Sequence, residues 1–307
     1  MKHVLVTGGN GFIGGYVVEE LQARGHSVSI LDRHHVVGDV HPATGLYFGD
    51  IKDATLVTEA VSHVDGVIHL AGVLGTQETI GNPLPAAETN ILGGLNVINA
   101  CSQYDVPLIN IAVGNYWMDN TYSITKNTVE RFVKMKAKEE GRVMASVRAL
   151  NAYGPGQVAA APYGPSRVRK IMPSFVCRAL SGEPIEIYGN GSQVMDMIYV
   201  DDVARILVSA LVALSQGKKF TTIEAGTGVR TTVNDIAEEV VNQVFSQTGK
   251  IVTVTHLPMR PGEEEDSVVL GDPSTLTQIG ISADQLTKLP IGIAITVAYF
   301  MDYLANA

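Results

Sequence analysis

The chain is poor in cysteine and in positive charge. Its two cysteines, Cys101 and Cys177, lie in helix-like segments without the spacing of metal ligands. Buried, reduced thiols are typical of a cytoplasmic protein, and we expect that location. Lys and Arg total 22 against 31 Asp and Glu, which gives a net charge of −9. Because binding to nucleic-acid phosphates needs a basic face, this balance argues against a nucleic-acid partner.

Signals for export, membranes and metals are also scarce. Residues 1–3 lead directly into a strand-like run without the cleavage signature of a secretory signal. The most apolar late segment, residues 289–304, is interrupted by a proline, a glycine and an aspartate, so we expect a packed helix and no membrane partner. His34, His35 and His41 do not have the spacing of metal ligands, and no metal site is predicted. At 307 residues the chain can form one large or two modest domains.

A glycine-rich turn lies near the start of the chain. Residues 2–7 predict a buried strand and residues 12–24 a helix, with Gly8, Gly11 and Gly14 at the junction. Missing side chains let a diphosphate approach the backbone, and the helix N-terminus offers free N–H groups. Three glycines alone could form only a tight turn. Because a strand precedes and a helix follows, we favour dinucleotide binding.

Acidic residues follow the next two predicted strands. Residues 27–31 end at Asp32, where a carboxylate can accept hydrogen bonds from both adenosine ribose hydroxyls and would repel a 2′-phosphate. This favours NAD over NADP, although Arg33 could pair with a phosphate. Asp50 could accept from the adenine amino group, or it could be only a turn or capping residue.

Strands and helices then alternate, as a parallel doubly wound sheet requires. We predict helices at residues 53–62 and 85–103 and strands at residues 66–70 and 107–112. The expected fold is α/β: a Rossmann-type doubly wound parallel sheet with a smaller, discontinuous C-terminal α/β substrate domain. We place the first domain at 1–165, with 195–215 packing back on it, and the second at 166–194 and 216–307.

A tyrosine and a lysine, Tyr122 and Lys126, stand four residues apart in a helix predicted at residues 122–140. Four residues are slightly more than one helical turn, so both side chains project from the same face. Since an ammonium favours a phenolate, we expect the pKa of Tyr122 to lie below its usual value of about 10. Tyr122 could then accept a proton near neutral pH. Taken alone, the pair could also be a surface pair on an amphipathic helix.

In this order, the glycine turn, the acidic strand end, Gly49-Asp50-Ile51, Leu70-Ala71-Gly72 and Tyr-x-x-x-Lys resemble the extended short-chain dehydrogenase/reductase family. The resemblance is to its NAD-dependent nucleotide-sugar epimerases and dehydratases. Later segments agree. Residues 148–156 resemble the family's Arg-x-x-Asn-x-Tyr-Gly-Pro segment, residues 188–204 its substrate strand and return helix, and residues 260–263 its late arginine loop.

The resemblance implies a role for each matching position. The residues expected to hold NAD are Gly8, Gly11, Phe12, Ile13, Gly14, Asp32, Arg33, Asp50, Ile51, Leu70, Ala71, Gly72, Asn90, Tyr122 and Lys126. Tyr122 would be the acid/base group, and Lys126 would bind the nicotinamide ribose and tune it. Asn151 and Arg260 would contact the diphosphate of a nucleotide-sugar substrate, since an arginine fork suits phosphate oxygens. Relatives commonly dimerise through the Tyr/Lys helix and its neighbour, which implies a homodimer.

Two positions depart from the family pattern. The family usually has a Ser or Thr after the fifth strand, where this chain has Ala112 or Val113. Asn115 is the nearest polar substitute and our third catalytic candidate, although it could be only a turn residue.

The second departure is Met195, which stands where many relatives have an arginine before the aspartate. Arg167, Arg169 and Lys170 could supply the missing charge for the substrate, or they could form a solvated basic turn. We take Arg167 as the substrate-binding candidate.

Three functions remain open. The leading hypothesis is a nucleotide-sugar 4-epimerase, with a UDP-sugar as substrate, that oxidises C4 transiently and then returns the hydride. The Asp-Glu pair of dehydratases and the glutamate of decarboxylases are absent at residues 112–117, although Asp119 keeps dehydration open. The third possibility is a dinucleotide-binding sensor without catalysis. The Tyr/Lys pair counts against a sensor, and the missing Ser or Thr counts for it.

Overall fold

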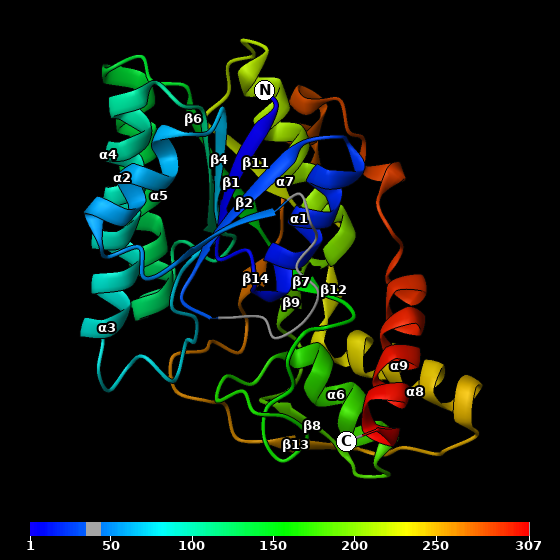
Figure 1. Cartoon of the computed structure of the whole chain (residues 1–307). Helices are drawn as coiled ribbons and strands as arrows, with labels where there is room; N and C mark the ends of the chain where they lie inside the picture. Colours follow the sequence, from blue (N-terminus) through cyan, green and yellow to red (C-terminus); the bar gives the residue numbers. More distant parts are fainter. Residues whose placement is uncertain (35–43, 307) are drawn as a thin grey trace.

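A seven-stranded parallel sheet forms the centre of the N-terminal part of the molecule (Figure 1). The computed structural model describes residues 1–34 and 44–306. The strands are β1 (His3–Thr7), β2 (Ser27–Asp32), β3 (Thr44–Phe48), β4 (Gly66–His69), β5 (Leu108–Val113), β6 (Met144–Ala149) and β11 (Thr222–Ala225). Their order is β11-β6-β5-β4-β1-β2-β3, so the direction of winding reverses between β1 and β4. Ligands of such sheets bind beyond the carboxyl ends of the strands at this point.

Helices cover both faces of the sheet, which confirms the predicted doubly wound fold. Figure 1 shows α1 (Phe12–Ala23) and α7 (Val200–Ser215) on one side, and α2 (Ala54–Ser62), α4 (Gly94–Tyr104) and α5 (Thr121–Glu139) on the other. The alternation of β1 explains the two cores: Val4 and Val6 pack with α1 and α7, whereas Leu5 packs with α2 and α4. All three side chains are fully buried.

The helix predicted at residues 85–103 is divided into three parts. A short helix, α3 (Leu84–Ala87), leads into a π-helical turn, Glu88–Gly93 (η1), which continues as α4. Such turns inside helices are frequent at functional sites. The turn places Asn90 in the interior, where it is 2% exposed.

The second domain packs three helices around a small parallel sheet. These elements are α6 (Ile171–Leu180), α8 (Val233–Thr248), α9 (Leu289–Ala305), β8 (Ile185–Tyr188) and β13 (Val254–Leu257). Met172, Ile187, Val240 and Phe300 belong to its core. Short ladders lie between the two domains: β7 (Asn151–Tyr153) pairs with β10 (Met197–Tyr199), and β9 (Val194–Met195) pairs with β12 (Thr231–Thr232) and β14 (Val268–Val269).

The division between the domains differs from the sequence-based one. We placed residues 216–307 in the second domain, but β11 pairs with β6 in the large sheet. The 3-10 helix Pro273–Ile279 (η2) packs on β11 and α7, and its Leu276 belongs to the first domain's core. The sequence could not show this, because a four-residue strand has the same pattern at the edge of either sheet.

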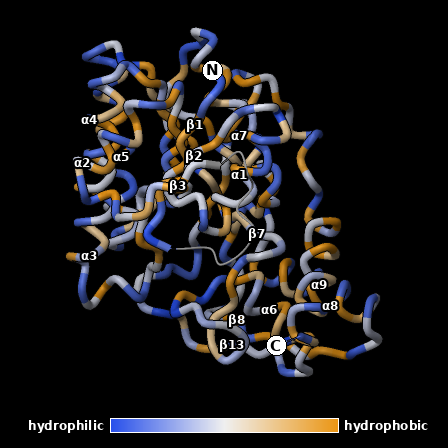
Figure 2. Tube along the Cα trace, in the orientation of Figure 1, coloured by the Kyte–Doolittle hydropathy of each residue, from blue (hydrophilic) through white to orange (hydrophobic). Residues whose placement is uncertain are grey.

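Helix α9 is the most apolar helix of the second domain, and hydrophobic segments recur along it in Figure 2. By length and composition alone, Ala283–Ala305 could cross a membrane: an 18-residue stretch of it has a mean hydropathy of 1.3, and 28% of that stretch is buried. Ile293, Val297 and Phe300 are buried against α6 and α8. This packing is the arrangement that we predicted for residues 289–304.

Candidate active site

A cavity of about 620 Å³ lies beyond the carboxyl ends of the sheet strands and extends to the second domain. We call the wall formed by the first domain the sheet side, and the wall formed by α6, β8 and residues 260–264 the second-domain side. Predicted site residues on the sheet side are Gly8, Gly11, Phe12, Ile13, Gly14, Asp32, Arg33, Asp50, Ile51, Leu70, Ala71, Gly72, Asn115, Tyr122, Lys126 and Asn151. Arg260 lines the second-domain side. The structure thus brings together most of the residues selected from the sequence.

The glycine turn is packed so closely that side chains would not fit. A Cβ on Gly14 would lie 2.2 Å from the carbonyl oxygen of Gly8, and a Cβ on Gly8 would lie 2.8 Å from the backbone nitrogen of Ala71. Gly8 also has a φ of +74°, in the left-handed region. Helix α1 begins at Phe12 in the cavity wall, so its first N–H groups, which have no acceptor within the helix, are available to a diphosphate. These features fit NAD.

Asp32 is held at the end of β2 by two backbone groups. Its Oδ2 accepts a hydrogen bond from the Asn10 N–H, and its Oδ1 accepts one from the His34 N–H, both at 3.0 Å. A carboxylate has about four acceptor positions, so two remain for ribose hydroxyls. Arg33 is exposed beside it in the cavity wall. Asp50 lines the cavity and also accepts from the Lys52 N–H at 2.9 Å, so both predicted roles fit its position.

Tyr122 and Lys126 lie on one face of α5 and both line the cavity. The helix starts at Thr121 because the Asn120 side chain accepts the Ser123 N–H at 2.9 Å and caps it. Burial lowers the pKa of Lys126 to about 8 and raises the pKa of Tyr122 to about 12. The expected lowering of the Tyr122 pKa is therefore wrong, because burial of the phenol disfavours its charged form.

Asn90 lies behind the cavity wall. Its amide oxygen accepts the Val73 N–H at 2.7 Å, and its amide nitrogen donates to the Val73 carbonyl at 3.1 Å and to Thr125 Oγ1 at 2.9 Å. A Cβ on Gly72 would lie 3.0 Å from Asn90 Oδ1 and 3.9 Å from Lys126 Nζ. Asn90 thus fixes the loop after β4 against α5. Its contact with the nicotinamide stays a prediction.

The segment between β5 and α5 contains a tight turn at residues 114–117. Asn115 and Met118 line the cavity, and the Asn115 carbonyl accepts the Met118 N–H at 3.1 Å. Asn115 is therefore both a turn residue and a polar group of the cavity wall. Ala112 and Val113, where the family resemblance led us to expect a hydroxyl, also line the wall. Asp119 is exposed and outside this wall.

Arginines and glutamates dominate the second-domain side. Arg260 pairs with Glu263, Nε to Oε2 at 3.2 Å, and its Cζ lies 4.7 Å from the centre of the Tyr188 ring. Arg169 donates to the Tyr188 hydroxyl at 2.7 Å. Asn151 lines the same cavity, and its backbone and side-chain nitrogens both donate to the Asp196 carbonyl, at 3.1 and 3.2 Å.

The basic turn before α6 contributes differently from the prediction. Arg169 and Lys170 line the cavity, whereas Arg167 is exposed and outside the wall. Sequence reasoning missed Ser174 and Arg178, which also line it. Their spacing could have identified them, because polar residues at positions 170, 174 and 178 follow one another at four-residue intervals and so lie on one helix face. The pKa of Lys170 lies below its usual value, mainly because the ammonium is buried.

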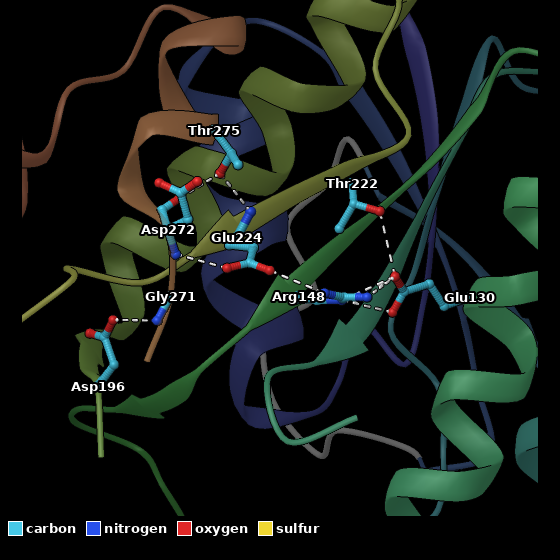
Figure 3. A network of polar contacts seen from close by, with 8 residues as sticks. All are labelled: Glu130, Arg148, Asp196, Thr222, Glu224, Gly271, Asp272 and Thr275. Carbon is cyan, nitrogen blue, oxygen red and sulfur yellow. Dashed lines mark hydrogen bonds and ion pairs between the residues drawn. The ribbon is translucent and has the colours of Figure 1, made fainter. Parts of the chain in front are cut away.

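Figure 3 shows a polar network that joins α5, β6, β11 and the loop before η2. Asp196 is fully buried, and its carboxylate accepts hydrogen bonds from the Thr227 N–H and hydroxyl and from the Gly228 and Gly271 N–H groups, at 2.6–3.1 Å. Because four donors from two loops converge on it, Asp196 ties the loop after β11 to the loop before η2. Arg148 links Glu130 of α5 with Glu224 of β11 in the same network.

No metal-binding cluster of three His, Cys, Asp or Glu side chains is found within residues 1–34 and 44–306. His35 and His41, which we considered as ligands in the sequence, lie outside the described residues. Cys101 and Cys177 are buried free thiols.

Comparison with known proteins places this geometry among nucleotide-sugar enzymes. Residues 4–226 match the model of the NAD dependent epimerase/dehydratase family. The chain is 32% identical to dTDP-glucose 4,6-dehydratase of Mycobacterium tuberculosis over 66% of this chain and 68% of that protein. It is 28% identical to UDP-N-acetyl-alpha-D-glucosaminuronate decarboxylase of Bacillus cytotoxicus over 86% of this chain and 87% of that protein. The crystal structure of Thermus thermophilus UDP-glucose 4-epimerase in complex with NAD superposes on this chain with a TM-score of 0.82. The sequence identity is 29%, and the match covers 97% of this chain and 99% of that one.

Proposed function

Because the chain belongs to the NAD dependent epimerase/dehydratase family, we propose that it is a nucleotide-sugar 4-epimerase that acts on a UDP-sugar. The family is a family of enzymes, and NAD is the cofactor. Its similar members include an epimerase, a dehydratase and a decarboxylase, so membership alone leaves three reactions open.

The distribution of acidic groups around Tyr122 supports epimerisation. Within the described chain, the carboxylates of the cavity wall belong to Asp32, Asp50, Glu186, Glu263 and Glu264. None of them comes from the segment between β5 and Tyr122. Asp119, the acid in that segment, is exposed and outside the wall. Epimerisation at C4 needs one acid/base group, whereas elimination needs a further proton donor next to it.

The residues of this chain divide the work as follows. Tyr122 accepts the proton of the sugar 4-hydroxyl through its phenol oxygen and returns it at the end, so the residue is unchanged over the cycle. Lys126, whose pKa is lowered to about 8, is still largely protonated at neutral pH, and its charge favours the phenolate that burial disfavours. NAD, held by the glycine turn and Asp32, would supply the acceptor for the C4 hydride and the donor for its return to the sugar. Arg260 provides N–H donors for the substrate diphosphate.

Nuclear magnetic resonance of the products tests the proposal. The protein, with NAD, is incubated with UDP-, dTDP-, GDP- and CDP-sugars, and Tyr122→Phe is the matched control because it removes only the phenol oxygen. We expect a C4 diastereomer from a UDP-sugar, and loss of turnover in Tyr122→Phe although this variant still binds NAD. NAD binding without turnover of any nucleotide sugar would instead support a dinucleotide sensor.

Dehydration is the second candidate, because the 32% identity to a dTDP-glucose 4,6-dehydratase favours it. The same experiment distinguishes the two enzymes. A 4-keto-6-deoxy sugar, most of all from a dTDP-sugar, would contradict the epimerase.

We also propose a homodimer built on α4 and α5 and their neighbouring π-helical turn. Leu92 in the π-helical turn and Ile124 and Met135 in α5 are 56%, 51% and 39% exposed, and contact with a second copy would remove these large apolar side chains from water. Light scattering should give a mass twice that of the chain, and Ile124→Lys should reduce it to that of one chain. A wild-type monomer at all concentrations would contradict the dimer.

A further inference from the structure

The guanidinium of Arg148, on β6, contacts the same face of α5 that carries the catalytic pair. Tyr122, Lys126 and Glu130 follow one another at four-residue spacing, so Glu130 continues that face. Arg148 Nε lies 3.0 Å from both carboxylate oxygens of Glu130, and its Nη2 lies 2.8 Å from Oε1 (Figure 3). The two side chains are only 17% and 5% exposed, so this ion pair is shielded from water.

A second carboxylate fixes the orientation of the guanidinium. Glu224 Oε1 accepts from Arg148 Nη1 at 3.1 Å, and Glu224 Oε2 accepts the Asp272 N–H at 2.7 Å. Two carboxylates in contact with one planar fork leave it little freedom to rotate. The position of Arg148 is thus set jointly by α5 and β11.

The face of this guanidinium lies against Tyr116. Arg148 Cζ is 3.7 Å from the ring centre, which is the geometry of a cation–π contact. Tyr116 belongs to the turn at residues 114–117, but unlike Asn115 and Met118 it is not among the residues of the cavity wall. The ring therefore contacts Arg148 from outside the cavity wall.

We propose that the Arg148–Tyr116 stack is a positioning device for the active site. It fixes the turn at residues 114–117 relative to α5, and it thereby sets Asn115 in the cavity wall that Tyr122 also lines. Asn115 is the polar residue that we selected from the sequence as a substitute for the Ser or Thr of the resembling enzymes. The kinetic part of the test rests on the proposed epimerase function, whereas the conformational part does not.

The chain contains a built-in reporter of this turn. Trp117 is its only tryptophan, is 47% exposed, and lies edge-on to the Tyr116 ring with centroids 5.3 Å apart. The decay of its fluorescence anisotropy measures local motion of the turn directly. Tyr116→Phe keeps the ring, and Tyr116→Leu removes it. Tyr299→Leu is the matched control. Tyr116 and Tyr299 are both 37% exposed, but Tyr299 stacks on Tyr303 in α9 and not on an arginine of the site.

We expect Tyr116→Leu to increase the amplitude of Trp117 motion and to lower kcat at least tenfold, with a KM within about threefold of the wild-type value. Tyr116→Phe and Tyr299→Leu should match the wild-type protein in Trp117 motion and in kcat. Tyr116→Met is the second variant without a ring, should Tyr116→Leu fail to fold. The proposal is overturned if variants without the ring show unchanged Trp117 motion, whatever their kcat, or if Tyr116→Phe behaves as Tyr116→Leu does. If the wild-type protein turns over no nucleotide sugar, the proposed function fails, and Trp117 motion alone still decides whether the stack fixes the turn.

Discussion

The sheet side and the second-domain side of the cavity offer ligands different chemical groups. On the sheet side, the glycine turn presents backbone N–H groups, and Asp32 is oriented by backbone donors. On the second-domain side, the groups are side chains of Arg169, Arg178 and Arg260, each paired with a glutamate. Backbone recognition depends on a few consecutive residues, whereas side-chain recognition depends on partners brought together from distant segments.

The same contrast separates what the sequence could predict from what it could not. The strand, glycine turn and helix at the start of the chain were predicted closely because their determinants are adjacent residues. The choice between Arg167 and its neighbours was not, because it depends on how the basic turn lies on β8. The rise in the Tyr122 pKa depends on burial by other elements, and the stack of Arg148 on Tyr116 joins residues that no local pattern relates.

The largest expected effect is on the sheet side, where Gly14→Ala should abolish NAD binding. The added Cβ would lie 2.2 Å from the Gly8 carbonyl, so the turn must open and the N–H groups move away from the diphosphate. Isothermal titration should show at least a hundredfold loss of NAD affinity. Gly15→Ala is the matched control, because a Cβ at Gly15 meets nothing within 4 Å. Equal losses in both variants would show that the effect is not steric.

Removing the buried charge of Lys126 should stabilise the protein while it inactivates the site. Burial lowers the Lys126 pKa from 10.5 to about 8. At pH 7 the ammonium is therefore charged in both the folded and the unfolded protein, and the free energy of folding includes the full cost of burying that charge. At about 1.4 kcal/mol per pKa unit, Lys126→Met should raise the free energy of unfolding by about 3 kcal/mol at pH 7.

The pH dependence of that gain checks its cause. Between about pH 8 and 10.5 the unfolded chain retains the proton that the folded chain has lost, so the wild-type protein gains stability relative to Lys126→Met as pH rises. Denaturant unfolding at pH 7 and pH 10 measures both values. A stability difference that does not shrink with pH would contradict this explanation.

On the second-domain side, Arg260→Met should weaken binding of UDP and leave NAD binding unchanged. A hydrogen bond to a charged group contributes about 1.5–3 kcal/mol, so we expect roughly a tenfold to hundredfold loss of UDP affinity. Arg167→Met is the control, since Arg167 is outside the cavity wall. An equal loss of NAD affinity in Arg260→Met would mean that the two sides are not independent.

The smallest effect expected is that of salt. Binding through exposed or half-exposed arginines is screened by ions, whereas backbone N–H groups at a helix end inside the cavity are screened less. Raising the salt concentration should therefore weaken UDP binding several-fold and NAD binding by less than twofold. Parallel slopes for the two ligands would contradict the contrast between the two sides.

The place of β11 in the large sheet has a consequence for how the molecule can be made. Until residues 222–225 have been synthesised, β6 is an open edge of a parallel sheet, and the core that Leu276 of η2 completes is unfinished. A fragment that stops at residue 165 would expose this edge and the apolar surface that α7 covers, and unpaired edges promote aggregation. We therefore expect that the two domains cannot be produced separately and recombined: the last quarter of the chain must be present before the first half can reach its final form.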